Sequence, residues 1–137
     1  MSDTLTPGAL ELIEQPVIGD FSTVDARGRP HVTPVWIDHE GNDVIVNTVK
    51  GRAKARHVEA QPAVAVSIVD PEDPYHVVVF MGTVTEISTE GADDHIDRMA
   101  KKYLGKDSYP FRRPGEVRIK LRIRPERILN QPDSAAA

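Results

Sequence analysis

Short runs of β-branched and apolar residues, most of them ended by turn residues, follow one another along this chain with few helical segments between them. Such runs predict β-strands, which we expect at residues 17–24, 31–37, 44–48, 63–69, 77–81 and 117–124. A doubly wound sheet would need a helix between most strands, and this chain lacks those helices. Six or seven strands in so small a chain favour a mainly β fold with short helices. We expect an antiparallel barrel, closed or nearly closed, because closure removes exposed strand edges.

Helices are expected at residues 9–14, 54–60 and 91–104. The last is the clearest, because Ile96, Met99 and Tyr103 fall on one stripe and charged residues fill the rest of the surface. The segments 25–28 and 38–42 are rich in turn residues, and we expect both to be turns.

Two strands carry further information. Residues 77–81 are apolar at every position, so we expect both faces to be covered, one by the barrel interior and the other by a helix or a second subunit. Gly82 is expected to permit a bend or bulge after this run. Residues 117–124 alternate between apolar and basic, and Pro125 is expected to end the pairing of that strand.

Composition limits the possible functions. The 137 residues suit one domain spanning residues 1–137, whose tail at about 131–137 is expected to be disordered. With 17 Lys and Arg against 21 Asp and Glu, general nucleic-acid binding is disfavoured. The chain has no cysteine, which excludes thiolate chemistry and suits the cytoplasm, and its five scattered histidines disfavour a metal site. No apolar run approaches a membrane span, and no signal-peptide pattern is recognisable near the start.

The segment 44–56, VIVNTVKGRAKAR, has the pattern of an anion site. An apolar strand reaches a glycine turn at Gly51, and a helix is expected just after it, where free backbone N–H groups attract anions. Basic side chains recur at Lys50, Arg52, Lys54 and Arg56. A phosphate would suit this arrangement, and a solvated basic helix face is the alternative interpretation.

That segment, with Pro62, Ser67 and the strings DPEDPY, GTV and KKYLG, resembles the split β-barrel flavin and deazaflavin oxidoreductases, the pyridoxamine 5'-phosphate oxidase-like superfamily. The strings GRAKAR, DPEDPY and KKYLG resemble the actinobacterial branch, flavin/deazaflavin oxidoreductase B, which uses coenzyme F420 rather than FMN. The resemblance covers residues 6–129. It implies an FMN-binding-protein-like split barrel and a homodimer with the cofactor at the subunit interface. It also implies hydride transfer from reduced F420 to a C=C or C=N bond of a small conjugated or aromatic substrate.

The resemblance also implies site residues. The cations Lys50, Arg52, Lys54 and Arg56, with Gly51 and Ala53 between them, would contact the phosphate and the acidic tail of the cofactor. No catalytic residue is expected, because the organic chemistry belongs to the cofactor.

Three further groups are implied to lie near the cofactor ring, each with a structural alternative. Asn47 and Thr48 would contact the ring edge or the ribityl chain, or serve only as strand-end turn residues. Pro34, Val35 and Trp36 would line the ring face, although Trp36 could instead anchor the core or an interface. The pair that would reach the cofactor from the partner subunit, or merely cap a loop, is Tyr75 and His76.

Alternatives remain for the function and for the basic strand. An FMN-binding oxidase or reductase of the same fold would need fewer cations, and a non-catalytic carrier of F420, FMN or haem would bind without turnover. The basic side chains of the last strand could form a solvated edge, pair with Asp93, Asp94 or Asp97, or receive the glutamate tail of F420. These basic side chains are Arg118, Lys120, Arg122 and Arg124.

Overall fold

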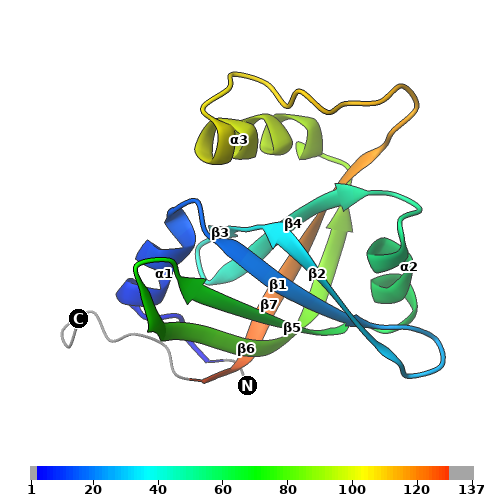
Figure 1. Ribbon diagram of the computed structural model, residues 1–137. Coiled ribbons are helices and arrows are strands. Elements are labelled where there is room, and N and C mark those ends of the chain that lie inside the picture. The colour runs from blue at the N-terminus through cyan, green and yellow to red at the C-terminus, as the bar shows by residue number, and fades with distance from the viewer. Residues whose placement is uncertain (1–2, 130–137) are drawn as a thin grey trace.

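A computed structural model describes residues 3–129 and contains one seven-stranded antiparallel sheet with three helices (Figure 1). The strands lie in the order β2-β1-β5-β6-β7-β4-β3. The predicted fold class, a mainly β antiparallel split barrel with short helices, is confirmed. The expected tail at about 131–137 lies outside the described residues. In chain order the elements are α1 (Pro7–Glu14), β1 (Ile18–Val24), β2 (Pro30–Trp36), β3 (Asp38–Glu40), β4 (Asp43–Val49), α2 (Ala53–Ala60), β5 (Ala63–Asp70), β6 (Asp73–Ser88), α3 (Ala92–Leu104) and β7 (Arg118–Leu129).

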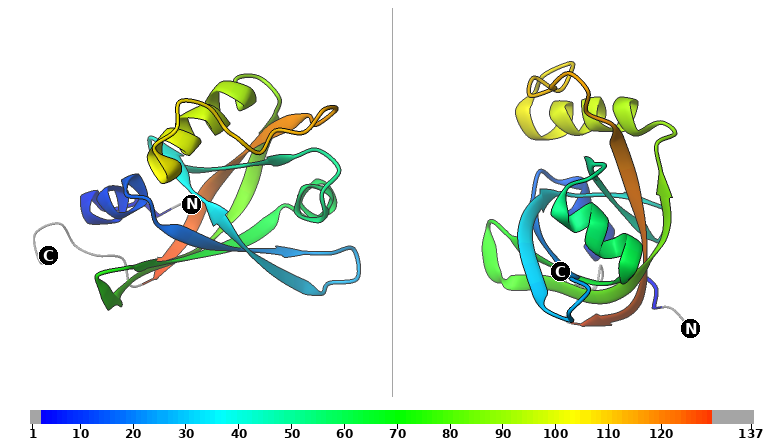
Figure 2. Two further views of the ribbon diagram at one scale, coloured as in Figure 1. Left: turned by 45° about the horizontal axis from the view of Figure 1, so that its top comes forward. Right: turned by 90° about the vertical axis from the view of Figure 1, so that its right-hand side faces the viewer.

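The sheet curls on itself, as the right-hand view of Figure 2 shows. Within residues 3–129 no ladder joins its first strand to its last, so it does not close by hydrogen bonds. Its two terminal strands are β2 and β3, and among the described strands β3 pairs with β4 alone, at Asp43, Val44 and Ile45. The later half of β4 therefore has no strand on that side within the described chain. This opening between β2 and β4 is the place where a ligand can meet strand ends.

The barrel interior holds the core. Phe21 of β1, Phe80 of β6 and Leu121 of β7 are almost fully buried, and α1 closes one end with Leu12 and Ile13. The apolar positions of β7 face inward at every second residue, as the alternation predicted. Each such side chain contributes about 1.5–3 kcal/mol by leaving water.

Two details differ from the expectations. Residues 38–40 were expected to be a turn, but they form the short strand β3, because Asp38 pairs with Ile45 and Glu40 with Asp43. Pro125 does not end β7, which runs on to Leu129. It lies opposite Gly82, where the register shifts, so its missing N–H costs no regular ladder bond.

The bulge predicted at Gly82 is confirmed by that register shift between Met81 and Gly82. A Cβ atom at Gly82 would lie 2.4 Å from the backbone oxygen of Arg124, so the close approach of β6 and β7 requires glycine here.

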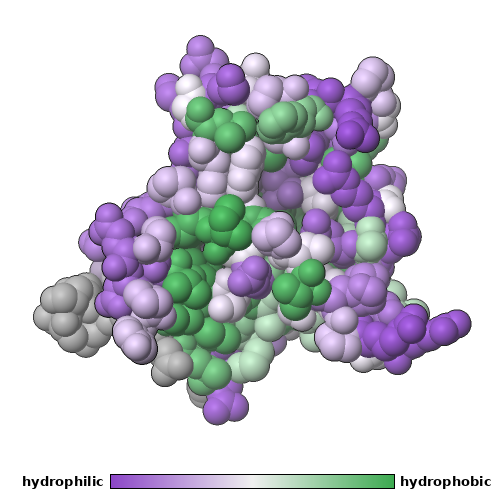
Figure 3. Space-filling view, viewed as in Figure 1, coloured by the Kyte–Doolittle hydropathy of each residue, from purple (hydrophilic) through white to green (hydrophobic). Residues whose placement is uncertain are grey.

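The outer face of the sheet carries an apolar patch, seen over β1, β5 and β6 in Figure 3. The strand register places its members side by side, because Val69 is opposite Val77 and Val79 is opposite Leu129. Ile18, Val69, Met81 and Leu129 are each more than a third exposed. We call this the outer-face patch: Ile18, Val69, Val77, Val79, Met81 and Leu129. No helix among the described residues covers the outward side of residues 77–81.

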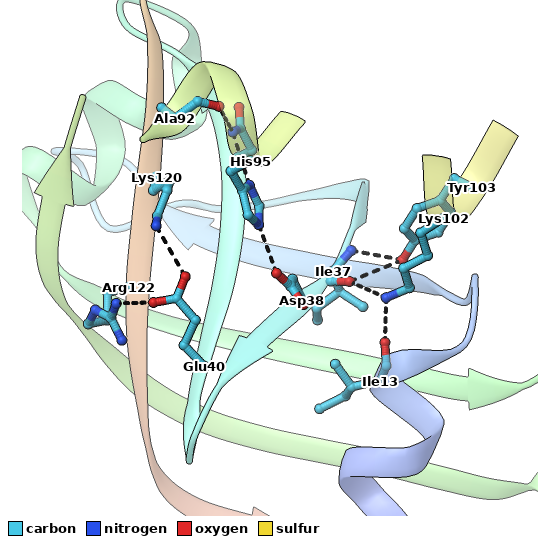
Figure 4. A network of polar contacts seen from close by, with 11 residues as sticks. Ile13, Ile37, Asp38, Glu40, Ala92, His95, Lys102, Tyr103, Lys120 and Arg122 are labelled. Carbon is cyan, nitrogen blue, oxygen red and sulfur yellow. Dashed lines mark hydrogen bonds and ion pairs between the residues drawn. The ribbon is translucent and has the colours of Figure 1, made fainter. Parts of the chain in front are cut away.

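Helix α3 lies across the top of the barrel (Figure 1). Hydrogen bonds from the side-chain ends of Lys102 and Tyr103 hold it there (Figure 4). Lys102 Nζ donates to the carbonyl oxygens of Ile13 and Ile37 at 2.6 and 2.7 Å. The Tyr103 hydroxyl donates to the carbonyl of Val17 and accepts from the N–H of Ile37, and burial raises the pKa of Tyr103 to about 12. These bonds fix α3 to the ends of α1 and β2, and α3 thereby covers the opening between β2 and β4. None of the described helices has the length and apolar character needed to cross a membrane.

Candidate functional site

A cavity of about 340 Å³ lies in the opening between β2 and β4. Side chains from α2, α3 and the segment after α3 complete its wall. Its lining combines apolar and aromatic side chains with three cationic ones, Arg52, Lys54 and Arg118, which suits a flat ring bearing an acidic substituent. The lining residues are Ile18, Pro34, Val35, Trp36, Asn47, Thr48, Arg52, Lys54, Ile96, Met99, Tyr109, Phe111 and Arg118.

The aromatic part of the wall is built around Trp36 at the end of β2. Its ring stacks on Tyr103 with centroids 4.9 Å apart and an interplanar angle of 6°, and it meets Tyr109 edge-on at 5.9 Å. Tyr109 in turn meets Phe111 edge-on at 5.6 Å. Because Tyr103 is held by two backbone groups, this cluster presents Trp36 to the cavity in a defined orientation.

The cationic part comes from the start of α2, where Arg52 occupies the N-cap position and Lys54 lies in the first turn. The N-cap residue makes no side-chain hydrogen bond to the helix, so the first N–H groups of α2 lack a side-chain cap. Burial, with the nearby charge of Arg52, lowers the pKa of Lys54 below its usual 10.5. No acidic side chain belongs to the lining among the described residues, and Glu116, which pairs with Arg52 at 3.2 Å, lies outside it. An anionic ligand would therefore meet a wall with net positive charge.

Other members of the same basic segment lie outside the cavity lining. Lys50 and Arg56 are exposed, and Arg56 donates to the carbonyl of Gly51. Gly51 adopts a φ of 93°, and Ala53 is the first residue of α2. The two cations of this segment that line the cavity are thus Arg52 and Lys54, which lie two positions apart around the turn rather than on one helical stripe.

Asn47 and Thr48, at the end of β4, both line the cavity. Thr48 is buried, and its Oγ1 has no hydrogen-bond partner within residues 3–129. Asn47 Oδ1 accepts from Arg118 Nη1 at 3.3 Å, and its Nδ2 donates to the carbonyl of Ala92 and to Nδ1 of His95. The buried His95 lies in α3, and its Nε2 is hydrogen-bonded to Asp38 Oδ2 at 3.0 Å. A chain of hydrogen bonds therefore runs from Arg118 in the cavity wall through Asn47 and His95 to Asp38.

Arg118 is the lining residue that the sequence pattern misplaced. It is only 6% exposed, and its guanidinium lies over the ring of Tyr109 at 4.6 Å. The interpretation of its strand as a solvated edge is wrong, because β7 lies between β6 and β4. Alternation correctly separated Arg118 from the core-facing residues, but it contains no information about what covers the other face.

Two other basic residues of β7 are occupied by ion pairs (Figure 4). Lys120 pairs with Glu40 at 3.1 Å, and Arg122 pairs with Glu40 and Asp43. Their partners come from β3 and β4, whereas the sequence had suggested Asp93, Asp94 or Asp97. Asp93 and Asp97 instead pair with Arg112, in the segment after α3.

Tyr75 and His76 lie in the β5–β6 hairpin and are not part of this cavity wall. Tyr75 is 94% exposed, while His76 pairs with Asp70 at 2.8 Å. Their expected contact was with the cofactor of a partner subunit, so that role stays a prediction.

Five apolar or aromatic lining residues were also absent from the sequence-based set. Ile96 and Met99 were assigned to the core stripe of α3, and Tyr109 and Phe111 follow in a segment without periodicity. Ile18 looks like any strand residue in the sequence. Their common feature is position in the fold, which no local pattern reveals. Within residues 3–129 no group of three or more acidic or histidine side chains is arranged to hold a metal ion.

Comparison with known proteins gives a family match over nearly the whole chain. The sequence model of the family described as pyridoxamine 5'-phosphate oxidase matches residues 5–131. Among proteins with curated descriptions, none matches significantly.

Several solved structures share the fold. An F420 reductase is 28% identical with a TM-score of 0.77, and the match covers 88% of this chain and 95% of that one. HupZ of Group A Streptococcus is 26% identical with a TM-score of 0.67, covering 93% and 94%. HutZ, a heme storage protein of Vibrio cholerae, is 18% identical with a TM-score of 0.63, covering 98% and 100%, and at that identity the likeness is one of fold alone.

Proposed function

This chain belongs to the pyridoxamine 5'-phosphate oxidase family, and we propose that it works as an F420H2-dependent oxidoreductase. The observation that carries the proposal is the composition of the cavity wall. Arg52, Lys54 and Arg118 contribute positive charge beside the aromatic ring of Trp36, with no acidic residue in the lining. A flat ring with an acidic substituent matches this combination of aromatic and cationic side chains, and the structural likeness to an F420 reductase supports the deazaflavin.

In this proposal the residues of the chain bind and orient. Arg52, Lys54 and the free N–H groups at the start of α2 hold the phosphate by charge-assisted hydrogen bonds. Pro34, Val35 and Trp36 lie against the ring face, while Asn47 and Thr48 face its edge. Lys50 and Arg56, with Gly51 and Ala53 between them, lie on the exposed side of the same turn, where the glutamate tail of F420 would leave the cavity.

The reduced deazaflavin, when bound, would supply a hydride for a C=C or C=N bond of a small conjugated or aromatic substrate. The chain contributes exclusion of water through Ile96, Met99 and Phe111, and a fixed ring position through the Trp36–Tyr103 stack. The other atom of that bond would take a proton from solvent, so no acid–base dyad of the chain is required.

We further propose that the protein acts as a homodimer in the cytoplasm. The outer-face patch, which exposes Ile18, Val69, Met81 and Leu129, supports a subunit interface because such a contiguous apolar surface is costly in water. A partner packed there could bring its Tyr75 and His76, which project from the β5–β6 hairpin, toward the cavity. The absence of cysteine suits a reducing compartment.

Two other functions share the fold. An FMN-dependent oxidase or reductase would use Arg52 and Lys54 for its single phosphate and leave Lys50 and Arg56 in solvent. A non-catalytic carrier of F420, FMN or haem would use the same cavity and bind without turnover.

Titration of the purified full-length protein with F420 and with FMN tests the proposal, with binding followed by quenching of Trp36 fluorescence. We expect F420 to bind more tightly, and reduced F420 to be consumed when a panel of enones and quinones is added. Tight FMN binding without F420 binding would contradict the choice of cofactor. Binding of reduced F420 without any turnover across the panel would favour the carrier.

A further inference from the structure

Arg118 combines deep burial with incomplete hydrogen bonding. Its side chain is 5% exposed, yet Nε and Nη2 have no hydrogen-bond partner among the described residues. Only Nη1 is engaged, by Asn47 Oδ1 at 3.3 Å. A buried charged group with unpaired donors is costly unless something completes its bonds, and Arg118 lines the cavity.

The unpaired donors form one edge of the guanidinium. Nε–H and one N–H of Nη2 point in parallel from that edge, and such a fork matches the two oxygens of a carboxylate. The other side of the group is already fixed, by stacking on Tyr109 at 4.6 Å and by the bond to Asn47. The edge is therefore held in place before any ligand arrives.

The nearest acidic group does not fill this edge. Glu116 Oε1 lies 4.0 Å from Arg118 Nη2, which is too long for a hydrogen bond. The same carboxylate accepts from Arg52 Nη2 at 3.2 Å and from the N–H of Arg113 at 3.0 Å. Glu116 thus stands between Arg52, at the start of α2, and Arg118, so the two arginines serve separate positions along the cavity.

We propose that Arg118 is the receptor for the carboxylate of the substrate, so that this protein acts on small conjugated carboxylic acids. The proposal rests on the proposed function in one respect, that the bound acid is the molecule to be reduced. The phosphate of the cofactor lies with Arg52 and Lys54, and the acid lies beneath Tyr109 and Phe111 with both oxygens on the Arg118 edge. The chain of Asn47, His95 and Asp38 positions the guanidinium for it.

The test uses benzoate and benzamide, which share a flat ring and differ in the carboxylate. Trp36 is the only tryptophan and lines the cavity, so its fluorescence reports binding to the cofactor-free protein. We expect benzoate to bind at least about tenfold more tightly than benzamide, the difference that hydrogen bonds to a charged group provide. Equal affinities, or no binding of benzoate up to its solubility limit, would overturn the proposal.

Two variants locate the effect. Arg118→Gln should lose about tenfold in benzoate affinity and leave benzamide unchanged. Arg118→Lys keeps the charge but not the fork, so it should also lose most of the preference for benzoate. Arg124→Gln, on the same strand with a side chain that is 51% exposed, is the matched control and should bind both as the wild type does. If Arg118→Gln does not fold, Arg118→Lys and the wild-type comparison decide, and unchanged benzoate binding in either variant would overturn the proposal.

The group that binds the Arg118 edge could belong to the substrate or to the cofactor. Titration of the same variants with F420 and FMN distinguishes these two sources. Variants that bind either cofactor less well but keep the preference for benzoate would assign the edge to the cofactor and overturn the substrate receptor. A wild-type protein that binds neither cofactor but shows Arg118-dependent benzoate binding would refute the proposed function and leave the receptor standing.

Discussion

Asn47 Oδ1 lies 3.3 Å from Nη1 of Arg118, and this contact determines the direction of every hydrogen bond behind it. A guanidinium can only donate, so the amide oxygen must face Arg118 and the amide nitrogen must face His95. Nδ1 of His95 therefore accepts, and its Nε2–H donates to Asp38 at 3.0 Å. One connected polar network therefore joins the cavity wall at Arg118 to the contact between α3 and Asp38.

Replacing Asn47 with alanine should lower the free energy of unfolding by about 2 kcal/mol, because Arg118, His95 and the carbonyl of Ala92 all lose a partner in a poorly hydrated place. Urea denaturation measures this change. Gln61→Ala, at the exposed end of α2, is the control and should be nearly neutral. Equal stabilities of the two variants would mean that the network adds nothing.

Lys102 is the second polar anchor of α3. Lys102→Met keeps the apolar stem but leaves the carbonyls of Ile13 and Ile37 without their donor, so we expect a loss of about 2 kcal/mol in the free energy of unfolding. Lys101→Met, one position earlier on the exposed side of the same helix, should change stability by less than about 0.5 kcal/mol. A Lys101 variant as unstable as the Lys102 variant would refute the anchoring role.

The fold was largely predictable because strand alternation is a local pattern that burial enforces. Ile119, Leu121 and Ile123 face the core as their spacing indicated. The strand at residues 38–40 was missed because its Asp-His-Glu sequence reads as a turn, and only the pairing with β4 makes it extended. Pro125 was misjudged because the bulge at Gly82, which tolerates it, lies more than forty residues away in the sequence.

The candidate site divides in a similar way. The neighbouring positions of Arg52 and Lys54, and the strand end at Asn47 and Thr48, can be read from one short segment. Arg118, Tyr109 and Phe111 come from a distant strand and an irregular segment, and only the curling of the sheet brings them to the same cavity. Tertiary placement of this kind leaves no local signal.

Val79→Asp should convert the proposed dimer to a monomer. Val79 lies in the outer-face patch, opposite Leu129, so a carboxylate there would be buried without a partner only in the dimer. We expect a halved mass by light scattering with little change in the melting temperature of the monomer. Thr85→Asp, farther along β6 and exposed, is the control and should keep the wild-type mass. An unchanged mass for Val79→Asp would place the interface elsewhere.

Lys54 and Lys50 should differ in which cofactor they affect. Lys54 lines the cavity, so Lys54→Met should weaken both FMN and F420 by about 1–3 kcal/mol through loss of a phosphate contact. Lys50 is exposed outside the cavity wall, so Lys50→Met should weaken F420, which has an acidic tail, and leave FMN unchanged. Fluorescence titration at two salt concentrations measures both. A Lys50 variant that weakens FMN as strongly as F420 would contradict this division.

The lowered pKa of Lys54 predicts how cofactor affinity depends on pH. Burial, together with the charge of Arg52, favours the neutral amine, so the free protein loses this cation at a pH below the usual lysine value of 10.5. Cofactor affinity should therefore fall as pH rises through that lowered pKa. Stability should move in the opposite direction, because between the lowered pKa and 10.5 the unfolded chain binds more protons than the folded one. Lys54→Arg keeps its charge throughout, so its affinity should stay flat over the same window. Dissociation constants measured across alkaline pH for both proteins test this, and a wild-type profile that coincides with that of Lys54→Arg would show that Lys54 does not contact the phosphate.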